Sequence, residues 1–341
     1  MASQAVEAAV DRHPGGLLLS GSDDFDQLSL NARAVLDGAI ERHTAAGLDG
    51  DLLPRGESAL RWIYDRGLNA YLYGQNGIGK GGMSAAHVAA TFEHTPDKEH
   101  PYVRLVGTGV GLDTIFTGTR AEGIHEAKRL YLGHKRVRGY FRGAVGPYPA
   151  GTPYSAHDPN MMKYTGVRIL GGLFAIDEQT HGPLPDYIGD AACQDGATAF
   201  ELLGLAREEF PQTRQELRDY ETELQESGEL QPSDTSEYFG KEILLNLPLP
   251  LLGVLLARHT IINPTQRAAL DEHTRETYGI RYNRLDELRA KAAALGIRAV
   301  GATPDSLRAR GVEPAFRLIE RTEASYIRHN QAHPIIPEYP Y

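Results

Sequence analysis

The stretch TRAEGIHEAKRLYLGHKRVRG, residues 119–139, contains the clearest helix pattern of the chain and decides its fold class. Thr119 and Glu122 have the spacing of a capping box, and Gly139 stands where a glycine commonly ends a helix. Between these signals, apolar side chains recur at intervals of three and four, which predicts one buried stripe along the helix. The stripe includes a histidine, and its members are Ile124, Ala127, Tyr131, His134 and Val137.

The same helical period continues on both sides of this stretch. A glycine-rich loop is expected at 74–82, and short strands are expected at most at 148–154 and 298–301. The predicted fold class is all-α: a single large helical domain over residues 29–330, preceded by an arm at 1–28 and followed by an extended, proline-rich tail at 331–341. Helices are predicted over residues 30–47, 57–73, 84–92, 119–138, 161–174, 197–210, 213–227, 236–247, 251–259, 264–278, 285–295 and 304–329.

Composition argues against several classes of function. The net charge of −10 over 341 residues argues against a surface built for nucleic acid, which would be basic. The longest apolar run, residues 243–262, is interrupted by Pro248, Pro250 and Arg258, so no stable membrane insertion is expected. The N-terminal residues lack the pattern of a signal peptide, and the expected location is the cytoplasm. Cys193 is the only cysteine, which excludes a disulfide within the chain, and we expect it to be a small buried residue.

His134 is the residue on which the functional interpretation depends. A neutral imidazole that projects inward from a helix is a suitable axial ligand for haem iron. The alternative is a buried histidine whose ring nitrogens are satisfied by hydrogen bonds, and for an isolated histidine that alternative is favoured. However, His134-x-x-Val-x-Gly139 is preceded by Arg104-x-x-x-Thr108 and followed by Tyr154-x-Ala-x-Asp-Pro159.

This succession of three motifs resembles the latex-clearing-protein and MpaB-type oxygenases, over roughly residues 60–280. The resemblance implies an all-helical domain that encloses haem b and uses dioxygen on a hydrophobic substrate; characterised relatives cleave carbon–carbon double bonds in isoprenoid chains. It implies that His134 is the metal ligand and that Arg104 and Thr108 are catalytic and cofactor-binding residues of the haem pocket. Tyr154 matches the third motif and is expected to be a cofactor-binding residue. Arg138, from the basic set on the 119–138 helix, is a candidate partner for a haem propionate.

The sequence also departs from the latex-clearing proteins. Gly107 stands where they have a lysine, and the export signal typical of them is not seen, so we expect a small intracellular metabolite as the substrate in place of polyisoprene. The catalytic acid or base is left open, with Glu93 and Glu99 as the nearest carboxylates. Asp158, directly before Pro159, is expected to cap the following helix.

Two other interpretations remain at this point. Gly74–Lys80 has the spacing of a phosphate-binding P-loop, but Gly81 replaces the usual serine or threonine, and a flexible loop beside the pocket is favoured. A non-catalytic protein that binds haem or senses a gas is the other alternative. His157 is expected to be either a distal group or an exposed residue.

The prediction is therefore a haem-b-dependent oxygenase acting with dioxygen on a small hydrophobic or aromatic metabolite; an external electron donor and a homo-oligomer are left open.

Overall fold

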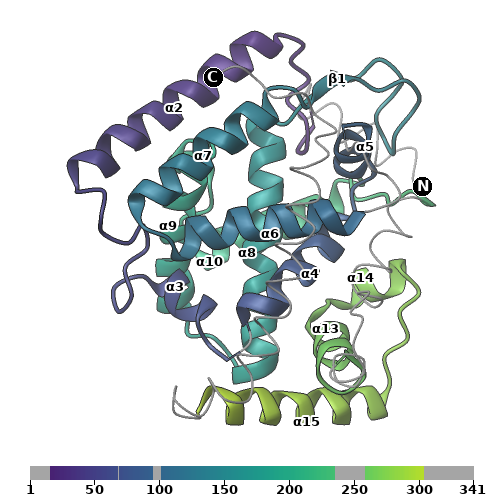
Figure 1. Ribbon diagram of the computed structural model, residues 1–341. Coiled ribbons are helices and arrows are strands. Elements are labelled where there is room, and N and C mark those ends of the chain that lie inside the picture. The colour runs from purple at the N-terminus through teal and green to yellow at the C-terminus, as the bar shows by residue number, and fades with distance from the viewer. Residues whose placement is uncertain (1–15, 68, 95–100, 235–257, 303–341) are drawn as a thin grey trace.

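The computed structural model describes residues 16–67, 69–94, 101–234 and 258–302, and it shows a bundle of helices (Figure 1). Within these residues, strands are confined to one antiparallel pair, β1 (Arg138–Tyr140) and β2 (Pro153–Ser155). The predicted all-α class is therefore confirmed. None of the described helices is both long and apolar enough to cross a lipid bilayer.

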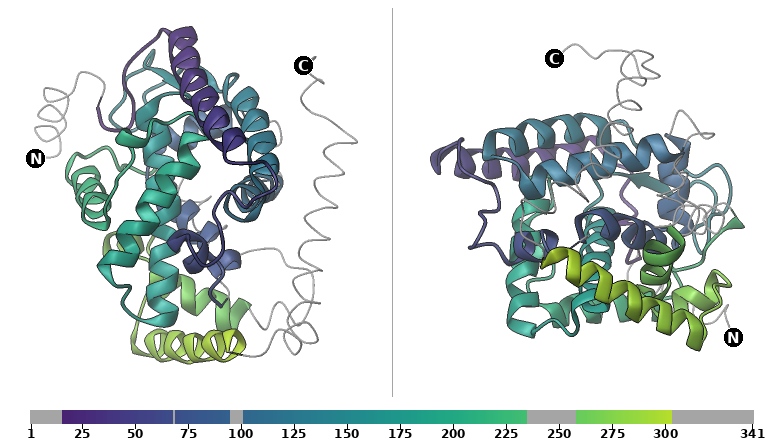
Figure 2. Two further views of the ribbon diagram at one scale, coloured as in Figure 1. Left: turned by 90° about the vertical axis from the view of Figure 1, so that its left-hand side faces the viewer. Right: turned by 60° about the horizontal axis from the view of Figure 1, so that its bottom comes forward.

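Helix α8 (Pro159–His181) runs through the middle of the bundle and is buried along most of its length. It packs against helices that come both before and after it in the sequence, and α15 covers one end of the bundle (Figures 1 and 2). The surrounding helices are α2 (Phe25–Ala45), α3 (Ala59–Tyr64), α4 (Asn69–Gly81), α5 (Ala85–Glu93), α6 (Pro101–Thr117), α7 (Arg120–His134), α9 (Asp186–Glu201), η1 (Arg207–Glu209), α10 (Arg214–Glu226), η2 (Arg258–Ile262), α13 (Asn263–Ala269), α14 (Glu272–Thr277) and α15 (Arg284–Gly301).

The central helix begins and ends at residues suited to those positions. Asp158 is its N-cap and accepts a hydrogen bond from the backbone N–H of Asn160, and Pro159 occupies the first turn, where no N–H is needed. Gly182, with φ of 92°, ends the helix in a conformation that other residues rarely adopt. The expectation that Asp158 is a helix cap is confirmed.

Asp158 also anchors the N-terminal arm. Its second carboxylate oxygen accepts hydrogen bonds from the backbone N–H of Ser20 at 2.7 Å and from the Ser20 hydroxyl at 2.8 Å. Leu17 and Leu18 donate their backbone N–H groups to Glu229, and Leu18 is fully buried. The described end of the predicted arm is thus docked on the bundle, while residues 1–15 lie outside the described part of the chain.

Replacing Asp158 by alanine is expected to lower the free energy of unfolding by about 2 kcal/mol, because a helix cap is lost and the partly buried donors of Ser20 lose their acceptor. Asp24 is a matched control, since it caps α2 through the N–H of Gln27 but is exposed. Asp24→Ala should cost about 1 kcal/mol or less. Urea denaturation of both variants measures the difference, and equal losses would show that the contacts to Ser20 contribute nothing.

Glycines bring α4 and α8 into backbone contact. A β-carbon added to Gly172 would lie 2.6 Å from the backbone nitrogen of Gly77, and one added to Gly77 would lie 3.0 Å from the carbonyl oxygen of Arg168. The predicted loop at 74–82 is wrong, because α4 continues through these glycines to Gly81. Glycine lowers helix propensity locally, but here its lack of a side chain permits a close helix crossing that stabilises the helix.

Several helix and strand boundaries in the structure differ from the predicted ones. The capping box at Thr119 and Glu122 is confirmed, but the helix ends at His134, because the chain then turns into β1 and pairs with β2. The predicted helix 57–73 is two helices, α3 and α4, and the predicted strand 298–301 is wrong, since those residues belong to α15. Helix α9 begins at Asp186, ahead of the predicted start. The predictions for 236–247, 304–329 and 331–341, and for 251–259 up to residue 257, lie outside the described residues.

Candidate active site

An apolar cavity of about 240 Å³ lies among α4, α5, α6, α7 and α8. Its walls are made largely of aliphatic, aromatic and glycine residues, including Leu112, Val137, Met161 and Phe200. The polar groups on the wall are few, as in most small-molecule sites, where they fix the orientation of a ligand. Among the described residues they include His87, His134, Thr108, Thr165 and Arg168.

His134 lines this cavity from the last position of α7. The residue is half-buried, so it reaches the cavity but is less buried than the apolar stripe of the helix predicts. Its ring meets that of His157 edge to face, with 6.1 Å between the ring centroids. The structure therefore brings the predicted metal ligand to the cavity, and ligation itself remains a prediction.

His157 lies behind His134 in the interior. It is 1% exposed, its ring stacks on Tyr131 at 4.7 Å, and its Nδ1 lies 3.1 Å from the hydroxyl of Ser29. Burial lowers the pKa of His157 to about 4, so this imidazole is neutral near pH 7. The expectation of an exposed residue is wrong. His157 contacts the ring of His134 and is not among the residues that line the cavity, and the distal alternative stays a prediction.

The Arg104-x-x-x-Thr108 motif lies on α6, beside the cavity. Thr108 and its neighbour Gly109 line the cavity, which agrees with the predicted place of Thr108. Arg104 precedes Thr108 by about one helical turn. The side chain of Arg104 lies outside the described residues, so its predicted role is untested.

Arg138 and Tyr154 are not among the residues that line the cavity. Arg138 lies in β1 and forms an ion pair of 2.7 Å with Asp26 at the surface. Tyr154 lies in β2, stacks on Phe141 and places its hydroxyl 2.9 Å from Nε2 of His94. Burial, with the nearby Glu93 carboxylate, raises the pKa of Tyr154 to about 12, so the phenol keeps its proton.

Of the two carboxylates considered as catalytic bases, only Glu93 lies in the described part of the chain. Glu93, at the end of α5, forms an ion pair of 3.0 Å with Arg142 and does not line the cavity. Glu99 lies outside the described residues. The buried thiol of Cys193 has its pKa raised to about 12 by burial, in agreement with its expected structural role.

Lys80, the lysine of the P-loop-like spacing, is a buried helix residue. Its Nζ lies 3.5 Å from Glu221 and 3.8 Å from Asp271. Arg168 shares the same Glu221 carboxylate at 3.0 Å. Because Gly74–Lys80 is helical, its backbone N–H groups are used within the helix and do not form a phosphate cradle. The P-loop interpretation is therefore not supported.

The lining of the cavity suits a largely apolar group. A β-carbon added to Gly74 or to Gly109 would meet no atom within 4 Å, so both residues leave open space where a side chain would stand. Helix backbone thus forms part of the wall, and an imidazole reaches it from α7. An iron that accepts a nitrogen ligand has the donor preference that the imidazole of His134 offers, and the apolar lining suits a largely apolar group around it.

Together, the fold and the cavity define the structural class of the protein. It is a helical domain that encloses an apolar cavity with an imidazole on its wall. Residues 67–299 match the family described as ER-bound oxygenase mpaB/B'/Rubber oxygenase, catalytic domain. The match covers more than half of the chain, and the chain belongs to this family, so its function is of the oxygenase type. The resemblance inferred from the three motifs is confirmed. No curated protein and no solved structure matches the chain.

Proposed function

We propose that the chain is a haem-b-dependent oxygenase that acts with dioxygen on a small hydrophobic or aromatic substrate. The observation that carries the proposal is the imidazole of His134 on the wall of an apolar cavity, within a domain of an oxygenase family. In this proposal His134 would hold the haem iron through an imidazole nitrogen. Haem, when bound, supplies the redox chemistry, as cofactors generally do.

The residues of the chain position the reactants. The ring of His157 contacts the ring of His134 edge to face and stays neutral. It therefore restricts the orientation of the His134 imidazole without adding charge. The apolar wall binds the substrate and excludes water, which protects reactive species from side reactions. Thr108 offers a hydroxyl at the wall, and Arg104, on the same helix, is proposed as a partner for a carboxylate such as a propionate.

The proposal is tested by supplying haem during expression and by measuring bound cofactor and oxygen uptake on the same sample. A Soret band together with substrate-dependent uptake of oxygen supports it. The uptake is measured with and without an added reductant, because an external electron donor is left open. Bound haem that never consumes oxygen with any apolar substrate would favour the non-catalytic haem-binding alternative. Protein that binds no haem would contradict both.

A further inference from the structure

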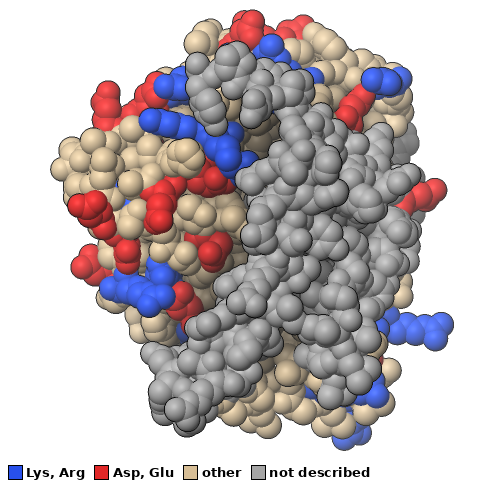
Figure 3. Space-filling model, in the orientation of Figure 1, with Lys and Arg blue, Asp and Glu red and all other residues tan. Residues whose placement is uncertain are grey.

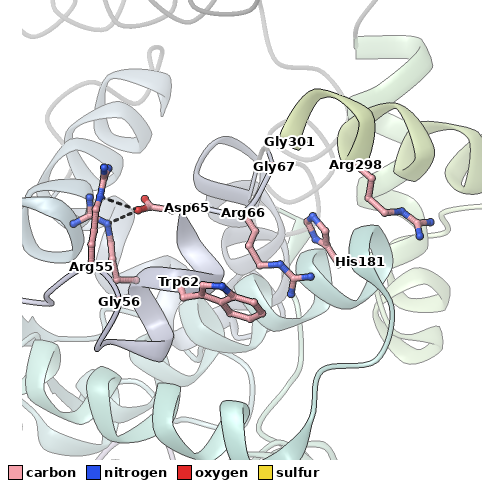
Figure 4. Close-up of a pocket in the computed structure, with 10 residues that line it drawn as sticks. Arg55, Gly56, Trp62, Asp65, Arg66, Gly67, His181, Arg298 and Gly301 are labelled. Carbon is pink, nitrogen blue, oxygen red and sulfur yellow. Dashed lines mark hydrogen bonds and ion pairs between the residues drawn. The ribbon is translucent and has the colours of Figure 1, made fainter. Parts of the chain in front are cut away.

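A second hollow, the Trp62 cleft, lies on the surface at the end of the bundle covered by α15 (Figure 4). It has a volume of about 500 Å³, within the range of small-molecule sites, which is roughly 300–1,000 Å³. Three segments that are distant in sequence form it: α3 and the loops around it, the end of α8, and the end of α15. The Trp62 cleft is separate from the cavity at His134, and the two share none of their described lining residues.

The Trp62 cleft is rich in arginine, although the chain as a whole has a net charge of −10. On the face shown in Figure 3, by contrast, acidic and basic side chains are interspersed among the described residues. Asp65 is the acidic residue among the described lining, and it forms ion pairs with both Arg55 and Arg61. Arg66 and Arg298 also line the cleft, as does His181. The cleft therefore carries excess positive charge.

Within the part of the chain that the structure describes, the contacts of these guanidinium groups leave N–H donors for a ligand. A guanidinium has five N–H donors. Arg66 forms one ion pair of 2.9 Å, with Asp177, and the Nε of Arg298 donates at 3.4 Å to the carbonyl oxygen of Ala294. Arg61, in contrast, is 4% exposed and donates to carbonyl oxygens at the end of α6, so its role is structural. Arg66 lies against Trp62, and Arg55 and Arg298 line the cleft on opposite sides of it (Figure 4), so an oxyanion can pair with Arg66 and with one of these two.

The buried carboxylate of Asp177 fixes the position of Arg66. Asp177 is fully buried, and it accepts hydrogen bonds from Arg66, from the Asn69 amide at 2.8 Å and, at 3.1 Å, it pairs with His181. One carboxylate thus holds two side chains of the cleft in place. A site whose donors are already ordered loses less entropy when its ligand binds.

Trp62 gives the cleft a flat aromatic wall. It is the only tryptophan of the chain and is 45% exposed, which is unusual for so large an apolar ring. The guanidinium carbon of Arg66 lies 4.3 Å from the centroid of its ring. This guanidinium covers one face of the indole, and the exposed remainder of the ring can stack a planar group while the guanidinium pairs with the negative charge of that group.

We propose that the Trp62 cleft binds a small planar molecule that carries a phosphate or carboxylate group. The guanidinium groups pair with the oxyanion and Trp62 stacks on the ring. Both parts are needed for tight binding, because a phosphate or a ring alone uses only half of the site. The proposal concerns a surface distinct from the cavity, and it does not depend on haem.

The fluorescence of Trp62 reports binding directly, since no other tryptophan contributes. The protein is titrated with adenosine monophosphate, benzoate, adenosine and inorganic phosphate, and calorimetry repeats each titration. We expect a saturable signal with adenosine monophosphate, with benzoate or with both, and binding at least about tenfold weaker with adenosine or phosphate. A response to adenosine monophosphate alone identifies a phosphate ester, and a response to benzoate alone identifies a carboxylate.

Two variants of α15 make the test specific. Arg298→Gln removes a charge from the cleft and is expected to weaken binding by about tenfold or more. Arg289→Gln removes an exposed charge of the same helix outside the cleft and should leave binding unchanged. No saturable signal with either anion, adenosine binding as tightly as adenosine monophosphate, or unchanged affinity in Arg298→Gln would each overturn the proposal.

Discussion

Replacing His134 by alanine is expected to reduce haem binding to background, because the proposed axial ligand is lost from a cavity whose wall is otherwise largely apolar. The measurement is the Soret absorbance per protein after purification with haem supplied. Free imidazole added to the variant should restore part of the band, since the cavity would have room for it in place of the side chain.

His125 provides a matched control, because it lies on the same helix but is exposed. His125→Ala should bind haem as the unchanged protein does. His157→Phe should retain haem with affinity lowered by roughly 10–100-fold, the usual effect of removing a group that orients a metal ligand. An unaltered spectrum in His134→Ala would show that the ligand is another residue, and His87 is the other imidazole on the described wall.

Replacing Gly172 by alanine is expected to destabilise the fold by about 3 kcal/mol, at the upper end of the usual cost of overpacking. The new β-carbon would lie 2.6 Å from the nitrogen and 2.8 Å from the α-carbon of Gly77, and 3.1 Å from the carbonyl oxygen of Tyr73. These are backbone atoms, which cannot rotate away as a side chain can. Helices α4 and α8 would have to separate, and the cavity between them would change with them.

The same substitution at Gly296 is expected to stabilise the protein instead of destabilising it. It lies within α15, and a β-carbon there would meet no atom within 4 Å. Gly296→Ala should stabilise the protein by about 0.5–1 kcal/mol, because alanine favours the helix. Denaturation midpoints compare the two variants. If Gly172→Ala were as stable as Gly296→Ala, the close crossing of α4 and α8 would not exist.

Local signals in the sequence predicted the features that depend on neighbouring residues. The capping box at Thr119 and Glu122 and the cap at Asp158 were predicted correctly, since each requires only a few consecutive residues. The inward position of His134 followed from the apolar period of its own helix. These features are local, and local propensity governs them.

The features that sequence analysis missed depend on distant partners. The glycines of α4 were interpreted as a loop because the reason for their helical state, the contact with Gly172, lies on another helix. His157 is buried by Tyr131 and Ser29, which no spacing rule connects to it. Its one signal was its place in the motif between Tyr154 and Asp158. The Trp62 cleft is formed by three segments that are distant in sequence, so no local sequence pattern predicts it.

The glycines of α4 have a consequence for selectivity. Gly74, Gly77 and Gly81 of α4, together with Gly82 directly after it, line the cavity, and none has a side chain that could adapt to a ligand. The contour on this side is set by main chain pressed against α8, so it cannot widen by small rearrangements. Any broadening or narrowing of the range of accepted molecules must therefore come mainly from lining residues with adjustable side chains, such as Leu112, Val137 and Met161.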